Sequence, residues 1–447
     1  MDEIDANPNA PTDVPLSLLL PQAIVNTASA VAGGNAAQAV VLFVEHATNV
    51  QLNIIEPMDV STPQWNNTYD GLMDLSVIIE KGSDNGDEAG NYAYVGIAKV
   101  LYAYTLGSAT DLFGDMPHSG ALQGNLNRTP EFDAQEEIYT YLQSLLDEAI
   151  ADLNRESLTN PGNLDLLYQG DTDRWSKAAY ALKARFHNRL SNINPQQSAQ
   201  DALQAIGNSF ETPAESLIFN QYQMGTTNDN PYADFQKGQN TYAVSTTFVD
   251  ILDEFTEEGF TDPRANYWLL EIDSTIVGAP PGTNESDIAH VLYSSPSLET
   301  ILADDAPLPL ITYDELKFIE AEANLRLNNP EAAYTAYTEA VEAALKRAGI
   351  EESSVTEYMN QGTVLPGVAG LTPEHIIKQK YISFWLLQSL EAYNDWRRTG
   401  IPELRHPEGT TLRLPYPLDE VNRNPNTPDN INDITIFTIP VWWDQNG

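Results

Sequence analysis

Hydrophobic positions along this chain recur mainly at helical spacing. Between residues 133 and 153 the apolar side chains stand three or four positions apart, at Ile138, Leu142, Leu145, Leu146, Ala149 and Leu153. This spacing predicts an amphipathic helix, with Asp133 and Glu136 as a capping box at its start. Residues 91–107 are apolar nearly all round, which is typical of a helix buried inside a protein. We expect further helices over 22–48 and 172–191.

The clearest helical unit covers residues 312–349. Thr312 and Glu315 predict a capped start. The sequence Asn328-Asn329-Pro330 then breaks the pattern, and a second helix is expected to run to Gly349. Alanines recur along this second helix and would allow a close partner, at Ala333, Ala336, Ala340 and Ala344. Two antiparallel helices within ~35–40 residues follow the tetratricopeptide-repeat plan. Another helix is expected to start at Thr372-Pro373.

Other parts of the chain lack helical periodicity. Residues 5–21 hold four prolines and predict an extended arm. Residues 210–310 are rich in Gly, Pro, Asn, Asp, Thr and aromatics, which predicts long loops with a few short helices and strands. So long an irregular stretch is usually functional. Beyond Pro402 the chain is again loop-like, with a short strand expected at 434–439.

These patterns predict a mostly α protein with one domain over residues 1–447. Its tetratricopeptide-like helical-repeat scaffold would occupy approximately 22–209 and 311–400, and a loop-rich, ligand-binding insertion would occupy approximately 210–310. The hydrophobic content of 42% is enough for a large buried core.

The charge balance excludes several kinds of partner. The chain has 22 Lys and Arg against 64 Asp and Glu, a formal net charge of -42. It therefore lacks the basic clusters that nucleic acids and anionic lipids require. Cysteine is absent and the six histidines share no ligand spacing, so we expect no metal and no cofactor. No run of ~18 apolar residues is apparent, so no membrane span is expected, and no signal peptide is expected within the given sequence.

Motifs for catalysis are missing from the sequence. It holds no G-x-S-x-G, H-E-x-x-H, P-loop or G-x-G-x-x-G helix motif. A glycoside hydrolase needs only two suitably spaced carboxylates, and 64 acids leave that alternative open. In the segment 111–117, Asp111 and Asp115 are expected to hold backbone N–H groups of a turn rather than a metal. Trp396-Arg397-Arg398 predicts an ion-paired, Trp-stacked structural cluster.

Several stretches, in order along the chain, resemble the SusD/RagB family. They are NPNAPT at 7–12, IAKV at 97–100, TDLFGDMP at 110–117, PEFDAQEEIY at 130–139, DLLYQGD at 165–171 with Trp175 and the run 182–191 after it, FIEAEA at 318–323, QKY at 379–381, WRRTGIP at 396–402 and RLPYP at 413–417. The ordered set spans nearly the whole chain and marks its scaffold.

The resemblance implies a SusD-like fold and a non-catalytic glycan-binding protein of the Bacteroidetes outer-membrane surface. Its implied partner is a TonB-dependent, SusC-like transporter, to which it delivers the glycan. Family members carry a lipidated cysteine at the mature N-terminus, whereas this sequence opens Met1-Asp2-Glu3. That start fits either a cytosolic N-terminus or the trimmed mature part of a lipoprotein. We expect a signal peptide and a lipobox cysteine to be encoded upstream.

A glycan site should combine aromatic planes for the C–H faces of sugars with amides and carboxylates for their hydroxyl rims. The insertion supplies both kinds of residue, namely Tyr222, Asn228, Asp229, Asn230, Tyr232, Tyr242, Tyr267 and Trp268. Trp65 is expected in an earlier polar loop, where the resemblance also implies binding residues. The alternative is that each aromatic packs beneath its own loop. The net charge favours a neutral β-glucan such as laminarin. A carboxylate-pair glycoside hydrolase and a peptide-binding tetratricopeptide scaffold remain the alternative functions.

Overall fold

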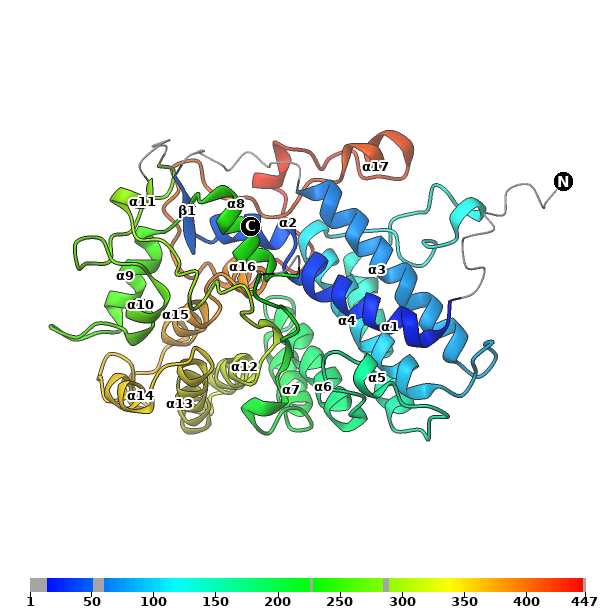
Figure 1. Ribbon diagram of the computed structural model, residues 1–447, viewed down its shortest axis with the longest axis horizontal. Coiled ribbons are helices and arrows are strands. Elements are labelled where there is room, and N and C mark those ends of the chain that lie inside the picture. Colours follow the sequence, from blue (N-terminus) through cyan, green and yellow to red (C-terminus); the bar gives the residue numbers. More distant parts are fainter. Residues whose placement is uncertain (1–13, 51–59, 226–227, 284–288, 445–447) are drawn as a thin grey trace.

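The computed structural model describes residues 14–50, 60–225, 228–283 and 289–444 of the chain, and these are mostly helical (Figure 1). The helices before the insertion are α1 (Leu16–Val25), α2 (Asn35–Phe43), α3 (Ser61–Gly82), α4 (Tyr92–Phe113), α5 (Gln135–Leu153), α6 (Thr172–Arg189) and α7 (Pro195–Ile206). Those after it are α12 (Tyr313–Arg326), α13 (Pro330–Arg347), α14 (Glu352–Met359), α15 (Pro373–Ser383), α16 (Ser389–Thr399) and α17 (Leu418–Arg423).

Neighbouring scaffold helices pack side by side through most of the molecule. Helix α4 packs against α3 and α5, α6 packs against α5 and α7, and α12 packs against α7 and α13. In Figure 1 the helices α5, α6, α7, α12, α13 and α14 follow one another along the lower edge. Helices α7 and α12 are separated by the whole insertion in sequence, yet they are in contact. The stack of helices is therefore continuous across the insertion.

The insertion contains more regular structure than its composition suggests. Its elements are β2 (Leu217–Phe219), α8 (Pro231–Gln239), β3 (Tyr242–Val244), α9 (Thr246–Glu254), α10 (Pro263–Trp268), α11 (Ala289–Leu292) and β4 (Leu308–Ile311). Strands β2 and β4 pair antiparallel, with Ile218 opposite Pro309, so the two ends of the insertion meet at its base. Strand β3 pairs antiparallel with β1 (Ala47–Asn49) and ties the insertion to the N-terminal helices.

One hydrophobic cluster extends from Leu16 to Trp443 and joins the scaffold to the insertion. The predicted alanine face of α13 is buried, as Ala333 and Ala340 show. Buried ion pairs connect the scaffold helices in addition. Arg185 on α6 meets Glu315 on α12 at 2.6 Å, and Lys380 on α15 meets Asp395 on α16 at 2.7 Å.

Most scaffold helices lie where the periodicity predicts, but some local details differ. The Thr372 hydroxyl accepts the N–H of His375 and caps α15, as expected. Helix α5 begins at Gln135 without the predicted capping box, because Asp133 accepts the N–H groups of His118 and Ser119 instead. At Trp396-Arg397-Arg398 the predicted ion-paired cluster is present: Arg398 pairs with Glu322 and Asp395, and Trp396 stacks on Tyr393.

Asp111 also differs from its predicted role. It lies in the last turn of α4, where it pairs with Arg189 at 3.3 Å and accepts the indole N–H of Trp443 at 2.8 Å. Asp111 thus belongs to the buried polar network rather than to a turn. Asp115 does accept a backbone N–H, that of Gln135, at 2.8 Å.

Near both ends of the chain, the structure differs from the secondary structure that the sequence predicts. The part of the predicted arm before residue 14 lies outside the described residues, and from Leu16 the chain is helical, with Pro21 inside α1. The strand expected at 434–439 is a 3-10 turn over Thr435–Phe437. The stretch Leu16–Phe43, which includes a π-helical segment at Asn26–Ala32, is long and apolar enough by length and composition to cross a membrane. Half of the most apolar 18-residue part of this stretch is buried within the protein.

Candidate functional site

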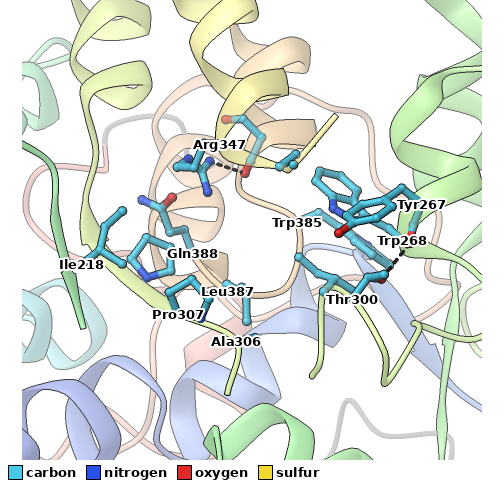
Figure 2. A pocket seen from close by; sticks show the side chains of 15 residues that line it. Ile218, Tyr267, Trp268, Thr300, Ala306, Pro307, Arg347, Trp385, Leu387 and Gln388 are labelled. Atoms are coloured by element: carbon cyan, nitrogen blue, oxygen red, sulfur yellow. Dashed lines mark hydrogen bonds between the residues drawn. The ribbon is translucent and has the colours of Figure 1, made fainter. Parts of the chain in front are cut away.

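A cavity of about 210 Å³ lies where the base of the insertion meets the ends of the repeat helices (Figure 2). Its lining comes from β2, α10, the segment before β4, the C-terminal end of α13 and the connection between α15 and α16. We call it the aromatic cavity. Tyr267 and Trp268, two of the residues that the sequence proposed, line one end of it together with Trp385.

The aromatic end of the cavity is supported from behind by stacked rings. Trp268 stacks on Trp385 with ring centroids 5.4 Å apart, and Trp385 stacks on Phe248 at 5.0 Å. The Trp385 indole N–H also donates to the carbonyl of His46 at 2.9 Å. Trp268 is only 4% exposed, whereas Tyr267 is 44% exposed. Tyr267 is therefore the ring that a ligand can reach, and Trp268 fixes the wall beside it.

Backbone conformation brings Tyr267 close to the end of α13. Gly349 follows that helix with φ of +81°, which favours glycine. A Cβ atom at Gly349 would stand 3.4 Å from the Tyr267 ring, so the glycine and the ring are already near contact. On its other side, the Tyr267 carbonyl accepts the hydroxyl of Thr300 at 2.7 Å. The position of the ring is therefore set by two segments.

Polar groups also line the cavity, and Figure 2 shows one of them, Gln388, beside Ile218 and Pro307. Arg347 donates to both carboxylate oxygens of Asp314, each at 2.9 Å, and to the carbonyl of Ser383. These bonds hold the guanidinium, while its Nη1 has no hydrogen-bond partner among the described residues. Gln388 donates through Nε2 to Glu315 at 3.1 Å, and its buried Oε1 accepts nothing from the part of the chain that the structure describes. The wall thus holds a guanidinium donor and a buried amide acceptor that both lack a partner among the described residues.

No carboxylate is among the residues that line the aromatic cavity. Glycoside hydrolysis requires a pair of them across the scissile bond, so this cavity suits binding rather than that reaction. A separate hollow of about 230 Å³ does include Glu254 and Glu374. Both of these acids are ion-paired to Lys378, at 2.5 and 2.8 Å. In the described part of the chain, no three Asp, Glu or His side chains gather as metal ligands.

The other tyrosines proposed from the sequence attach the insertion to the scaffold. Tyr222, Tyr232 and Tyr242 are at most 5% exposed. The Tyr242 hydroxyl donates to the carbonyl of Gln38 at 2.6 Å, and the Tyr222 hydroxyl bonds the hydroxyl of Ser29 at 3.0 Å. Burial raises the pKa of Tyr222 to about 12. As placed here these rings offer no face to a sugar, because their rings lie in the core and their hydroxyls are mostly engaged.

The proposed polar residues 228–230 have local roles. Asn230 caps α8 by accepting the N–H of Tyr232, and it donates to the carbonyl of Ala306 at 2.8 Å. Asp229 pairs with Lys237 at 2.7 Å. Asn228 donates to the carbonyl of Gln221 at 2.9 Å. None of the three lines the aromatic cavity.

Trp65 is also placed differently from the expectation. It lies on α3, is 6% exposed, and is surrounded by the rings of Tyr69, Phe113, Phe132 and Tyr416, with centroids 5.1–6.3 Å away. These rings occupy its faces and edges, so Trp65 belongs to the core.

Sequence reasoning missed most of the cavity lining, including Arg347, Trp385 and Gln388. They stand at helix ends of the scaffold, where the periodic pattern predicts packing alone. The positive φ of 60° at Leu386 turns the chain between Trp385 and Gln388. No sequence signal marks that turn.

Comparisons with known proteins show which family shares this architecture. The family model SusD-like_2, described as "Starch-binding associating with outer membrane", matches residues 8–417. A search of curated proteins found no match. Among solved structures, a SusD/RagB family protein from Bacteroides thetaiotaomicron VPI-5482 is similar over 97% of this chain and 99% of its own, with 28% identity and a TM-score of 0.84.

Two further structures share the fold at lower identity. One, titled a chitin-binding protein, is 22% identical, with a TM-score of 0.79 and coverage of 96% of this chain and 99% of its own. The other, a chitin-binding SusD homolog from Flavobacterium johnsoniae, is 18% identical, with a TM-score of 0.76 and the same coverage.

Proposed function

Because this chain belongs to the SusD-like family, we propose that it is a non-catalytic surface protein that captures a poly- or oligosaccharide in the aromatic cavity. The observation that carries this proposal is the pairing of an accessible ring, Tyr267, with unused hydrogen-bonding groups on Arg347 and Gln388. Sugars present both an apolar C–H face and a polar rim, so they need such a combination.

The net charge and the cavity lining both support one class of glycan. A chain of net charge -42 repels polyanions at low salt, and the cavity exposes no carboxylate for a cationic sugar. Both features support a neutral glycan, and we retain a β-glucan such as laminarin as the first candidate. Two structural neighbours are titled chitin-binding, so chitin belongs in the same comparison.

Affinity electrophoresis tests the capture of glycan. The protein is run in gels that contain laminarin, starch, glycol chitin, xylan or alginate, beside Tyr267→Ala and the control Tyr334→Ala. Tyr334 is partly buried near the opposite end of α13 and lies outside the cavity lining. We expect a neutral polysaccharide to retard the wild type and the control equally and Tyr267→Ala less. If no polysaccharide retards the wild type, the proposal is wrong. Released sugar products would instead indicate the hydrolase alternative, and unretarded protein that binds peptides would indicate a tetratricopeptide scaffold.

The proposed role also includes delivery of the glycan to a transporter and anchoring of the protein to the outer membrane. The family description places its members in association with the outer membrane. We infer that this chain is held there by an N-terminal lipid and passes its glycan to a TonB-dependent transporter. Co-purification with the transporter encoded beside it, in mild detergent, tests the partner. The codons upstream of Met1 test the anchor, and the absence of a lipobox cysteine there would contradict it.

A further inference from the structure

A larger hollow adjoins the aromatic cavity. It measures about 660 Å³, and we call it the polar groove. Ile218 on β2 and Pro307 before β4 line both hollows, so they form a shared ridge between them. Figure 2 shows Ile218 and Pro307 at the end of the cavity away from Tyr267 and Trp268. A ligand that extends past this ridge therefore enters the groove. Pairing of β2 with β4 holds the ridge in place.

Side-chain amides dominate the polar lining of the groove. Asn163 and Gln169 come from the segment before α6, and Asn220 and Gln221 follow β2. All four are exposed. Each amide both donates and accepts, which matches a sugar hydroxyl that does the same. The groove thus offers hydrogen bonds along its length, whereas the aromatic cavity offers a ring at its far end.

The groove exposes no carboxylate even though the chain is strongly acidic. Its one acidic lining residue, Asp165, is fully buried. The Asp165 carboxylate accepts the N–H groups of Leu167, Tyr168 and Gly170 and the indole N–H of Trp175, so its oxygens are occupied. Arg174 lies over the Tyr168 ring at 4.2 Å and donates to the carbonyl of Ala214. The accessible polar lining therefore consists mainly of amides and one guanidinium, which suits a hydroxyl-rich chain.

We propose that the aromatic cavity and the polar groove are subsites of one extended site for a linear, neutral oligosaccharide. One sugar ring would lie against Tyr267, and the following units would cross the Ile218–Pro307 ridge into the groove. A volume of about 210 Å³ is below the roughly 300–1,000 Å³ of common ligand pockets, so the cavity alone holds only a short ligand. This inference rests on the proposed function and adds the length of the ligand to it.

Calorimetric titration with oligosaccharides of two lengths tests the inference. The probes are laminari-, malto- and chito-oligosaccharides of two and of six units. We expect the six-unit member of one series to bind wild type at least roughly tenfold more tightly than its two-unit member. The double variant Asn163→Ala/Asn220→Ala should lose roughly five- to tenfold in affinity for the six-unit probe, because two hydrogen bonds are removed. Its affinity for the two-unit probe should be unchanged.

The control is Asn154→Ala, an exposed amide at the end of α5 that lies outside both hollows. It should bind both lengths as wild type does. Equal affinity for the two lengths, or a double variant that binds the six-unit probe like wild type, overturns the subsite inference and leaves glycan capture intact. If none of the three series binds and the polysaccharide gels also show no retardation, the proposed function fails and this inference fails with it.

Discussion

Trp65 and Tyr267 stand in two aromatic groups that the sequence does not distinguish. Around Trp65, four other rings pack within 5.1–6.3 Å and the residue is only 6% exposed. The hydroxyls of Tyr69 and Tyr416 donate to the carbonyls of Pro117 and Asp115. Near Tyr267, Trp268 stacks on Trp385 and Trp385 stacks on Phe248, whereas Tyr267 itself stays 44% exposed and lines the cavity. The difference lies in how many neighbours the fold brings, and local sequence does not determine that number.

The largest expected effect is on stability and concerns the aromatic group around Trp65. Trp65→Ala would leave a cavity among tightly packed rings and should lower the free energy of unfolding by about 3–5 kcal/mol. Chemical denaturation followed by circular dichroism measures this. The control Leu126→Ala, at a side chain that is 91% exposed, should change it by less than ~0.5 kcal/mol. A Trp65 variant as stable as the control would show that Trp65 is not tightly packed in the core.

The scaffold was largely predictable from sequence, whereas the site was predictable only in part. Helical periodicity is a local property, so the helix pair at 312–349 and the cap at Thr372 could be found from spacing alone. Tyr267 and Trp268, which the sequence proposed as ligand residues, line the same cavity, and Tyr267 is the exposed ring of the two. Arg347 and Gln388 could not be found, because they join the site only through contacts between distant segments.

The second expected effect concerns pH and the support beneath the aromatic cavity. Burial lowers the pKa of the His46 ring to about 3. The neutral ring accepts the N–H of Leu386 and contacts the carbonyl of Tyr381 through its other nitrogen. Below pH ~6.5 the His46 ring binds a proton in the unfolded chain but stays neutral in the folded protein. The free energy of unfolding therefore falls as the pH drops towards 3. At pH 5 the loss should reach about 2 kcal/mol, at 1.36 kcal/mol per pH unit.

Denaturation at pH 7 and pH 5, for wild type and His46→Gln, measures this contribution. The variant keeps the other histidines, so the difference between the two pH dependences isolates His46. We expect the variant to lose less stability on acidification than wild type does. Parallel losses in the two proteins would contradict the role assigned to the buried ring.

A smaller effect, on glycan affinity, is expected when Tyr267 at the aromatic cavity is changed. Tyr267→Ala removes the accessible ring and should weaken binding of the cognate polysaccharide roughly tenfold, by analogy with the ~1–3 kcal/mol of base–aromatic stacking. Because Tyr267 is 44% exposed, we expect little change in the unfolding midpoint. Affinity electrophoresis at several polysaccharide concentrations gives the ratio, with Tyr334→Ala alongside. Loss of binding in both variants would point to a general disturbance of the fold instead of a lost ring contact.

The smallest effect is expected at Asp229, which the sequence proposed as a ligand residue. Its carboxylate pairs with Lys237 at 2.7 Å and is absent from the lining of both hollows. Asp229→Asn should leave glycan affinity unchanged and alter the free energy of unfolding by less than ~1 kcal/mol. Titration with the same oligosaccharides checks this. A tenfold weaker affinity would move the site towards the 228–230 segment.

The most direct measurement is a crystal structure of the protein with the six-unit oligosaccharide that binds it best. The account predicts one sugar ring against Tyr267, a hydroxyl near Arg347 or Gln388, and further units beyond Ile218 and Pro307 in the polar groove. A sugar chain bound at another surface, with the aromatic cavity unoccupied, would contradict it.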